Sequence, residues 1–292
     1  MPPRISVFPK CYFDELYSGR MDYLAWLGDA ATLGAEGVEH YDGFFKHGVE
    51  PVLRVLKETG QVSSMLCFSP DFTQPDAVER DRQIVRQRAA IDLCVALGIR
   101  HCRTLSGQRF PGMTRKEGIE RTVECIRRSL DYAEKRNVIL CMENHYKDGT
   151  WLYPEFAQPE DIFLEIIGQI NSPYFGVQFD PSNATVGGFD PVAFLEKVKT
   201  RVVTMHASDR SLAAGATLDD LRQAEGTAGY TSKLIHGETG KGLNDYDAIF
   251  RILRSVNFSG WISVEDGMNG LDELRRSVDF LKQKRTQYYR ST

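Results

Sequence analysis

Short runs of apolar and β-branched residues alternate along the chain with longer segments of helical periodicity, and this alternation continues to its end. One helical segment carries apolar residues four and three positions apart from Ile119 onward, which keeps them on one face. Thr114, with Glu117 three residues later, predicts a capping box at its start. Similar apolar stripes cover 246–256 and 271–281. The runs that we predict as strands begin near Ile5, Gly37, Gln61, Arg100, Val138, Gly176, Val202 and Trp261.

Eight strands that alternate with helical segments in 292 residues predict an α/β fold, a (β/α)8 TIM barrel that forms a single domain over 1–292. The alternative is an open, doubly wound sheet with a small second domain, which would carry a glycine fingerprint after its first strand. Phe8-Pro9-Lys10-Cys11 stands there instead, so the barrel is favoured. The glycine- and alanine-containing stretch 210–236 predicts a long loop with a short helix after the seventh strand.

The composition is that of an ordinary globular protein, with 42% hydrophobic residues and a net charge of -4. Nucleic-acid binders usually present a basic face, so no nucleic-acid partner is expected. The six cysteines form no CxxC pair, which indicates a reducing compartment. No signal-peptide pattern follows Met1, and no run approaches the roughly 18 apolar residues of a membrane span. We therefore expect a cytoplasmic protein with no membrane partner.

Four of the later strands end in a residue that can ligate a metal ion: Glu143, Asp180, His206 and Glu265. In each strand the residue two positions earlier shares the same face and is polar or small, whereas the apolar neighbours face the other way. The C-terminal strand ends of a barrel meet at one mouth, where catalytic groups lie. Three carboxylates and an imidazole there would suit a divalent cation, Mn²⁺ before Mg²⁺, Co²⁺ or Zn²⁺. Alternatively, each residue separately caps a helix or pairs with Lys or Arg.

Several strings around these residues resemble the xylose isomerase-like barrel superfamily: Met142-Glu143-Asn144-His145, Asp180-Pro181-Ser182-Asn183, His206-Ala207-Ser208-Asp209, 237–246 and Val264-Glu265. The most similar group is that of sugar phosphate isomerases and epimerases, which includes ketose 3-epimerases, inosose dehydratases and C-glycoside-cleaving subunits. The resemblance implies that Glu143, Asp180, His206 and Glu265 bind a divalent metal. It also implies that the two glutamates face opposite sides of a bound sugar. Asn183 stands where several epimerases carry a histidine, which counts against a ketose epimerase.

Further polar residues are expected around the same mouth. His145 lies two residues beyond Glu143, so it is a candidate general base or substrate hydrogen-bond partner, or else it orients Glu143. Asp209 either binds a sugar hydroxyl or orients His206. Aromatic residues near the strand ends suit stacking on a sugar ring or an aryl group. The residues that we expect to contact substrate are Glu39, Tyr41, Asn183, Asp209 and Lys147.

A cation that grips a carbonyl oxygen and a neighbouring hydroxyl acidifies the adjacent C–H bond. Glu143, Glu265 or His145 would then remove the proton and give a metal-stabilised enediolate. Reprotonation makes the protein an isomerase or epimerase of a keto sugar or cyclitol, which is our first expectation. Expulsion of a β-substituent makes it a lyase, either a dehydratase or an enzyme that cleaves C-glycosides or 3-oxo-glycosides.

Two other classes are considered. An abasic-site endonuclease shares this barrel, but it would need more histidines than the six present and a basic surface. A catalytically silent sugar-binding subunit is opposed by the four intact ligand positions. The expected partners are a sugar-derived small molecule and further protein chains, as a homo-oligomer or a hetero-oligomer with a small subunit.

Overall fold

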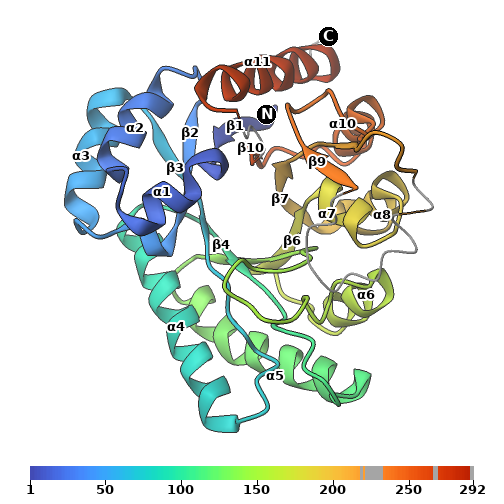
Figure 1. Ribbon diagram of the computed structural model, residues 1–292. Helices are drawn as coiled ribbons and strands as arrows, with labels where there is room; N and C mark the ends of the chain where they lie inside the picture. Colours follow the sequence, from blue (N-terminus) through green and yellow to red (C-terminus); the bar gives the residue numbers. More distant parts are fainter. Residues whose placement is uncertain (218–219, 221–232, 266–268, 290–292) are drawn as a thin grey trace.

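All eight runs predicted as strands form strands, and these pair in parallel into a closed barrel in the order β1-β10-β7-β6-β5-β4-β3-β2 (Figure 1). The computed structural model describes residues 1–217, 220, 233–265 and 269–289. The predicted (β/α)8 TIM barrel is confirmed. The barrel strands are β1 (Arg4–Val7), β2 (Gly37–Tyr41), β3 (Val62–Cys67), β4 (His101–Thr104), β5 (Ile139–Glu143), β6 (Phe175–Phe179), β7 (Val202–Ala207) and β10 (Trp261–Val264).

Helices surround the barrel on its outside (Figure 1). The predicted capping box is present at the start of α5, where the Thr114 side chain and the Glu117 side chain bond each other's backbone N–H groups. The α-helices are α1 (Phe13–Ser18), α2 (Tyr23–Ala31), α3 (Val49–Thr59), α4 (Ala77–Ala96), α5 (Arg115–Glu134), α6 (Glu160–Gly168), α7 (Pro181–Val186), α8 (Pro191–Val198), α10 (Tyr246–Ser255) and α11 (Leu271–Tyr288). Three short 3-10 helices are η1 (Lys10–Tyr12), η2 (Asp42–Phe44) and η3 (Lys199–Arg201).

The two faces of each strand bury different sets of side chains. On β5, Leu140 and Met142 point outward and join the large core beneath the helices. Ile139 and Cys141, on the opposite face, join a small apolar cluster inside the barrel with Met65 of β3. The outer core therefore supplies most of the apolar burial that stabilises the fold, and the barrel interior stays available for polar groups.

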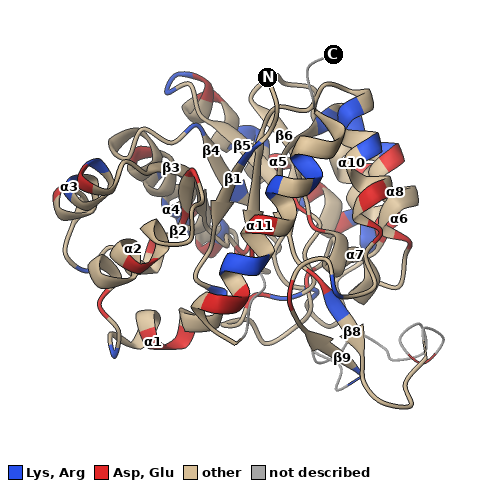
Figure 2. Cartoon of the chain, turned by 90° about the horizontal axis from the view of Figure 1, so that it is seen from above, with Lys and Arg blue, Asp and Glu red and all other residues tan. Residues whose placement is uncertain are grey.

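The segment after β7 differs from the predicted long loop. β8 (Arg210–Leu212) and β9 (Leu234–His236) pair antiparallel and form a hairpin beside the barrel (Figure 2). Paired backbone groups at both ends of the segment satisfy hydrogen bonds that a loop would leave to water. The short helix expected within 210–236 falls largely on 218–219 and 221–232, which lie outside the described residues.

Charges of both signs are interspersed on the outer helices α8, α10 and α11 (Figure 2). The six cysteines form no disulfide. Among the described residues, no helix combines the length and apolar character that a membrane crossing requires.

Candidate metal centre and its cavity

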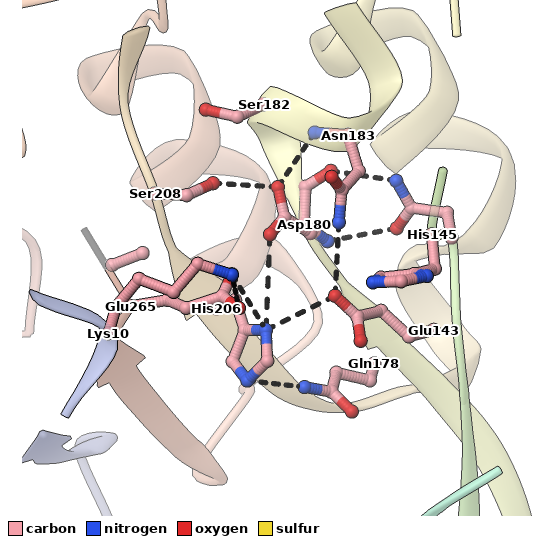
Figure 3. Close-up of polar contacts among 12 residues, drawn as sticks. Lys10, Glu143, His145, Gln178, Asp180, Ser182, Asn183, His206, Ser208 and Glu265 are labelled. Atoms are coloured by element: carbon pink, nitrogen blue, oxygen red, sulfur yellow. Dashed lines mark hydrogen bonds and ion pairs between the residues drawn. The ribbon is translucent and has the colours of Figure 1, made fainter. Parts of the chain in front are cut away.

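The structure brings the four predicted ligands together at the C-terminal ends of neighbouring strands (Figure 3). Glu143 is the last residue of β5 and His206 lies in β7, whereas Asp180 and Glu265 directly follow β6 and β10. Asp180 also caps helix α7, because its Oδ1 accepts the backbone N–H of Asn183 at 2.8 Å. The first turn of this helix therefore fixes the carboxylate at the mouth of the barrel.

The spacing of the ligand atoms fits a divalent ion. His206 Nδ1 lies 3.2 Å from Glu143 Oε1, 3.3 Å from Glu265 Oε2 and 3.9 Å from Asp180 Oδ2. Atoms that each bind an ion at about 2.0–2.3 Å stand roughly 3–3.7 Å apart, so these distances suit a shared ligand shell. Asp180 Oδ2 is buried and has no hydrogen-bond partner among the described residues. A buried carboxylate oxygen of this kind needs a cation or a donor.

The pKa shifts indicate the same need for positive charge. Burial raises the pKa of Asp180, and the neighbouring charges of Glu265 and Glu143 raise it further, to well above its usual value. Burial also opposes the charged form of Glu143, but the His206 and Arg103 cations outweigh it and lower the pKa of Glu143 to about 2. Burial would lower the pKa of His206, yet the carboxylates around it raise that pKa well above its usual value. At the ligand set, the carboxylates therefore outnumber the side-chain cations that face them.

The other ring nitrogen of His206 has closer neighbours. Nε2 donates to Glu39 Oε1 at 2.7 Å, and the Cys67 thiol donates to the same oxygen at 2.8 Å. These are hydrogen-bond lengths, too short for atoms that share an ion. Glu39 is 1% exposed and bonds His206, and its expected contact with substrate stays a prediction. Its carboxylate orients the imidazole so that Nδ1 faces the ligand set.

Two further side chains hold Glu143, one on each carboxylate oxygen. Arg103 of β4, 5% exposed, donates from Nη1 to Glu143 Oε2 at 2.8 Å. Asn183 donates from Nδ2 to Glu143 Oε1 at 3.1 Å and so supports this ligand, and its expected contact with substrate stays a prediction. The sequence alone did not indicate Arg103 as a functional residue. A lone arginine within a short strand that is otherwise uncharged is the feature that would have indicated it.

A cavity of about 710 Å³ reaches the ligand set at Glu265. Glu265, Arg103 and His145 line it, as do the predicted residues Tyr41 and Lys147. Its aromatic wall is formed by Phe8, Phe13, Tyr17, Tyr41 and Tyr146. The cavity therefore joins an apolar wall to a charged floor, as small-molecule sites commonly do.

His145 is held in place by a carboxylate that the sequence analysis did not single out. His145 Nδ1 lies 3.1 Å from Oε2 of Glu155, which is completely buried. The other oxygen, Oε1, accepts the backbone N–H and the hydroxyl of Ser106, each at 2.9 Å. Because Nδ1 of His145 faces Glu155, the other ring nitrogen, Nε2, can contact a substrate. Glu155 lies in an irregular loop, where no periodic pattern points to it.

Asp209 bonds several backbone groups, and its expected contact with substrate stays a prediction. Its carboxylate accepts the backbone N–H groups of Gly240, Gly242 and Asn244, at 2.9–3.2 Å, and that of Arg210 at 3.0 Å. Asp209 is buried and is absent from the cavity lining. It thus fixes the loop between β9 and α10.

Comparisons with known proteins agree with this architecture. A model of the family "Xylose isomerase-like TIM barrel" matches residues 27–284. The 3-oxo-isoapionate decarboxylase of Pectobacterium atrosepticum is 28% identical over 161 residues, which cover 54% of this chain and 49% of that relative. The match therefore spans about half of the length of this curated relative.

Solved structures extend the likeness over almost the whole chain. A D-tagatose 3-epimerase-like protein has a TM-score of 0.77 at 16% identity and covers 98% of both chains. The IolI protein, solved with a zinc atom, has a TM-score of 0.75 at 14% identity and covers 99% of this chain and 100% of its own. The probable 3-DHS dehydratase AsbF of Bacillus anthracis has a TM-score of 0.73 at 18% identity and covers 96% and 98%. With a closed barrel and a family match over most of its length, the chain belongs to the xylose isomerase-like TIM barrel family.

Proposed function

We propose that the protein is a divalent-metal-dependent isomerase or epimerase that moves a proton next to the carbonyl of a keto sugar or cyclitol. The observation that carries this proposal is a single cavity lined by His145, oriented by Glu155, and by Glu265 of the four-residue ligand set. The likeness to a D-tagatose 3-epimerase-like protein, a probable 3-DHS dehydratase and a 3-oxo-isoapionate decarboxylase supports chemistry next to a carbonyl.

Glu143, Asp180, His206 and Glu265 would hold the ion. When bound there, a divalent ion supplies polarisation of a carbonyl and its neighbouring hydroxyl, which acidifies the C–H bond between them. His145 accepts that proton at Nε2, and the Glu155 carboxylate stabilises the imidazolium that forms. Manganese is our first choice of metal, because three of the four ligands are carboxylates.

The two glutamate ligands take different parts in this proposal. Both oxygens of Glu143 already accept hydrogen bonds, from Arg103 and Asn183, so we assign Glu143 to metal binding rather than to proton transfer. Glu265 lines the cavity, and its Oε1 lies 3.4 Å from Lys10 Nζ. Because it is the member of the ligand set that lines the cavity, it is the carboxylate that we assign to return a proton to the substrate, which epimerisation requires on the face opposite to His145.

A metal-dependent lyase is the second candidate. The 3-oxo-isoapionate decarboxylase is a lyase by its name, and the aromatic wall of the cavity can accept an aryl leaving group. In this reaction His145 removes the same proton, but a bond to a β-substituent then breaks and the substituent departs with the electron pair.

Elemental analysis followed by incubation in D₂O tests the proposal. Keto sugars, inositol ketones and 3-oxo-glycosides are incubated with the metal-loaded protein, and the products are weighed by mass spectrometry. Deuterium uptake without loss of a fragment supports an isomerase or epimerase. Loss of water or an aglycone supports the lyase, and no exchange with any compound overturns both.

A further inference from the structure

A second hollow of about 190 Å³ lies beside the metal cavity, and we call it the side pocket. Tyr41, Asp148 and Thr150 line both hollows, so these side chains form a shared wall. The rest of its lining comes from η2, the N-terminal half of α4 and the segments after β3, β4 and β5, including Phe68, which follows β3, and Trp151. The side pocket therefore adjoins the reaction site but holds none of the four ligands.

The side pocket is built on a saturated hydrogen-bond network. The buried Asp71 carboxylate accepts the Gln108 backbone N–H at 2.9 Å and the Gln108 and Gln74 side-chain amides at 2.7 and 2.6 Å. Gln108 in turn accepts the backbone N–H of Leu152 at 2.7 Å. These bonds tie together the loops that follow β3, β4 and β5. Because the loops are fixed, the pocket exists before any ligand arrives.

Three polar groups of the lining are left without such bonds. The Arg86 guanidinium of α4 lies 5.5 Å from the centre of the Phe68 ring, and it has no hydrogen bond or ion pair among the described residues. The Asp42 carboxylate and the Tyr41 hydroxyl likewise bond to no other residue in the described part of the chain. In the metal cavity, by contrast, the Arg103 guanidinium is paired with Glu143. A rigid pocket with unmatched donors and acceptors is suited to a polar ligand.

The charges and size of the side pocket narrow the class of ligand. Asp42, Asp71 and Asp148 outnumber the two guanidiniums near them, that of Arg86 in the lining and that of Arg103, which donates to the lining residue Ser69, so an anionic group is disfavoured. The Asp42 carboxylate can accept hydrogen bonds from vicinal hydroxyls, and the Arg86 guanidinium can donate hydrogen bonds to them. Phe68 and Trp151 offer apolar faces. The volume equals about six water molecules at ~30 Å³ each, which suits one small ring or chain.

We propose that the side pocket binds a neutral polyhydroxylated group, namely a second sugar ring or polyol chain attached to the substrate that reacts in the metal cavity. The link to a reacting substrate rests on the proposed function, whereas binding in the side pocket does not. The substrate class is thereby a glycosylated keto sugar instead of a free monosaccharide.

Binding of cellobiose and glucose to the metal-free 292-residue chain tests the proposal by saturation-transfer NMR and calorimetry. Cellobiose is expected to bind saturably, and Arg86→Ala and Asp42→Ala should each raise its Kd about tenfold, the cost of one hydrogen bond to a charged group. Arg82→Ala is the matched control, since Arg82 lies on the same helix, is exposed and pairs with Glu79. Absence of saturable binding, or equal Kd values in wild type and Arg86→Ala, overturns the proposal.

A turnover measurement separates this proposal from the proposed function. For a 3-oxo-glucoside and its glucosyl-extended form, Arg86→Ala should raise KM for the extended compound alone and leave kcat of both unchanged. Equal KM changes for both compounds would show that Arg86 does not contact the second ring. If no compound exchanges deuterium in the wild type while cellobiose binding still depends on Arg86, the proposed reaction is wrong and the proposed sugar binding in the side pocket is supported.

Discussion

The two sides of the His206 ring face carboxylates at different distances. At Nδ1, oxygens of Glu143, Glu265 and Asp180 lie 3.2–3.9 Å away, whereas at Nε2 the Glu39 oxygen lies 2.7 Å away. Both groups are buried acids around one imidazole, so acidity and burial alone do not distinguish them. The spacing distinguishes them, because the Nδ1 side leaves room for an ion among its oxygens and the Nε2 side is closed by its direct hydrogen bond to Glu39. One histidine thus separates a metal-binding set from the groups that orient it.

The largest effect should follow a change on the Nδ1 side. Asp180→Ala is expected to abolish stoichiometric metal binding and activity together, because it removes a ligand oxygen that has no hydrogen-bond partner in the described part of the chain. Metal content is measured by elemental analysis and the fold by circular dichroism. Asp190→Ala is the matched control, since Asp190 also caps a helix, α8, but lies away from the ligand set. Full metal occupancy in Asp180→Ala would show that the ligand set is misassigned.

A change in the cavity should affect turnover without affecting the metal. His145→Ala is expected to lower kcat by roughly 10²–10⁴ with metal content nearly unchanged, since it removes a positioned proton acceptor. Glu155→Gln should give a smaller loss, because the amide keeps a hydrogen bond to the ring but cannot stabilise its cation. If His145→Ala instead weakens metal affinity first and turnover recovers at saturating metal, the histidine only orients Glu143.

A change on the Nε2 side should affect metal affinity more mildly. Glu39→Ala is expected to weaken metal binding about 10- to 100-fold, the usual loss for a group that orients a ligand. Glu39→Gln keeps an acceptor for Nε2–H and should lose less. Calorimetry also gives the number of ions bound per chain. One ion in both the wild type and Glu39→Ala would agree with a Glu39 that only hydrogen-bonds His206. Two ions in the wild type and one in Glu39→Ala would make Glu39 a ligand of a second ion.

The smallest effect concerns His40, a buried imidazole surrounded by different groups. His40 contacts the Tyr23 hydroxyl at 2.5 Å and the Ser63 hydroxyl at 2.8 Å, and burial lowers its pKa to about 3. The unfolded chain takes up this proton near pH 6.5 and the native state does not, so stability should fall as the pH drops below 6.5. The contribution is about 1.4 kcal/mol per pH unit between roughly 6.5 and 3, and it is constant above 6.5.

Urea unfolding at several pH values measures this slope, and His40→Gln should make it shallower by that amount. His101, whose pKa burial lowers to about 4, contributes a similar slope in both proteins and so cancels in the difference. An unchanged slope in His40→Gln would mean that His40 is protonated in the native state.

The fold and the Nδ1 side were predictable because they depend on local periodicity. Period-two alternation assigns Glu143 and His206 to the inner faces of their strands, and parallel strands bring those faces to one mouth. The capping box at Thr114 was found for the same reason, since its partners lie three residues apart.

The Nε2 side and the support of His145 were not predictable in this way. Glu39 and His206 are 167 residues apart, and nothing in either local sequence indicates that the two meet. Glu155 occupies an irregular loop, and the role of Asp209 depends on backbone groups 31–35 residues further along. Such contacts follow from the three-dimensional closure of the barrel, so alternation along one strand does not reveal them.

The strand pairing that closes the barrel also determines when the metal site can form during folding. β1 pairs with β10 across almost the whole chain, and Lys10 meets Glu265 at a separation of 255 residues. Contacts between residues so distant in sequence form slowly, because the entropy of closing a long loop must be overcome first. A barrel that still lacks β10 also lacks Glu265 and has only three of the four ligands. Full metal affinity is therefore an indicator of completed folding, and a bound ion would stabilise the closed barrel over every unclosed form.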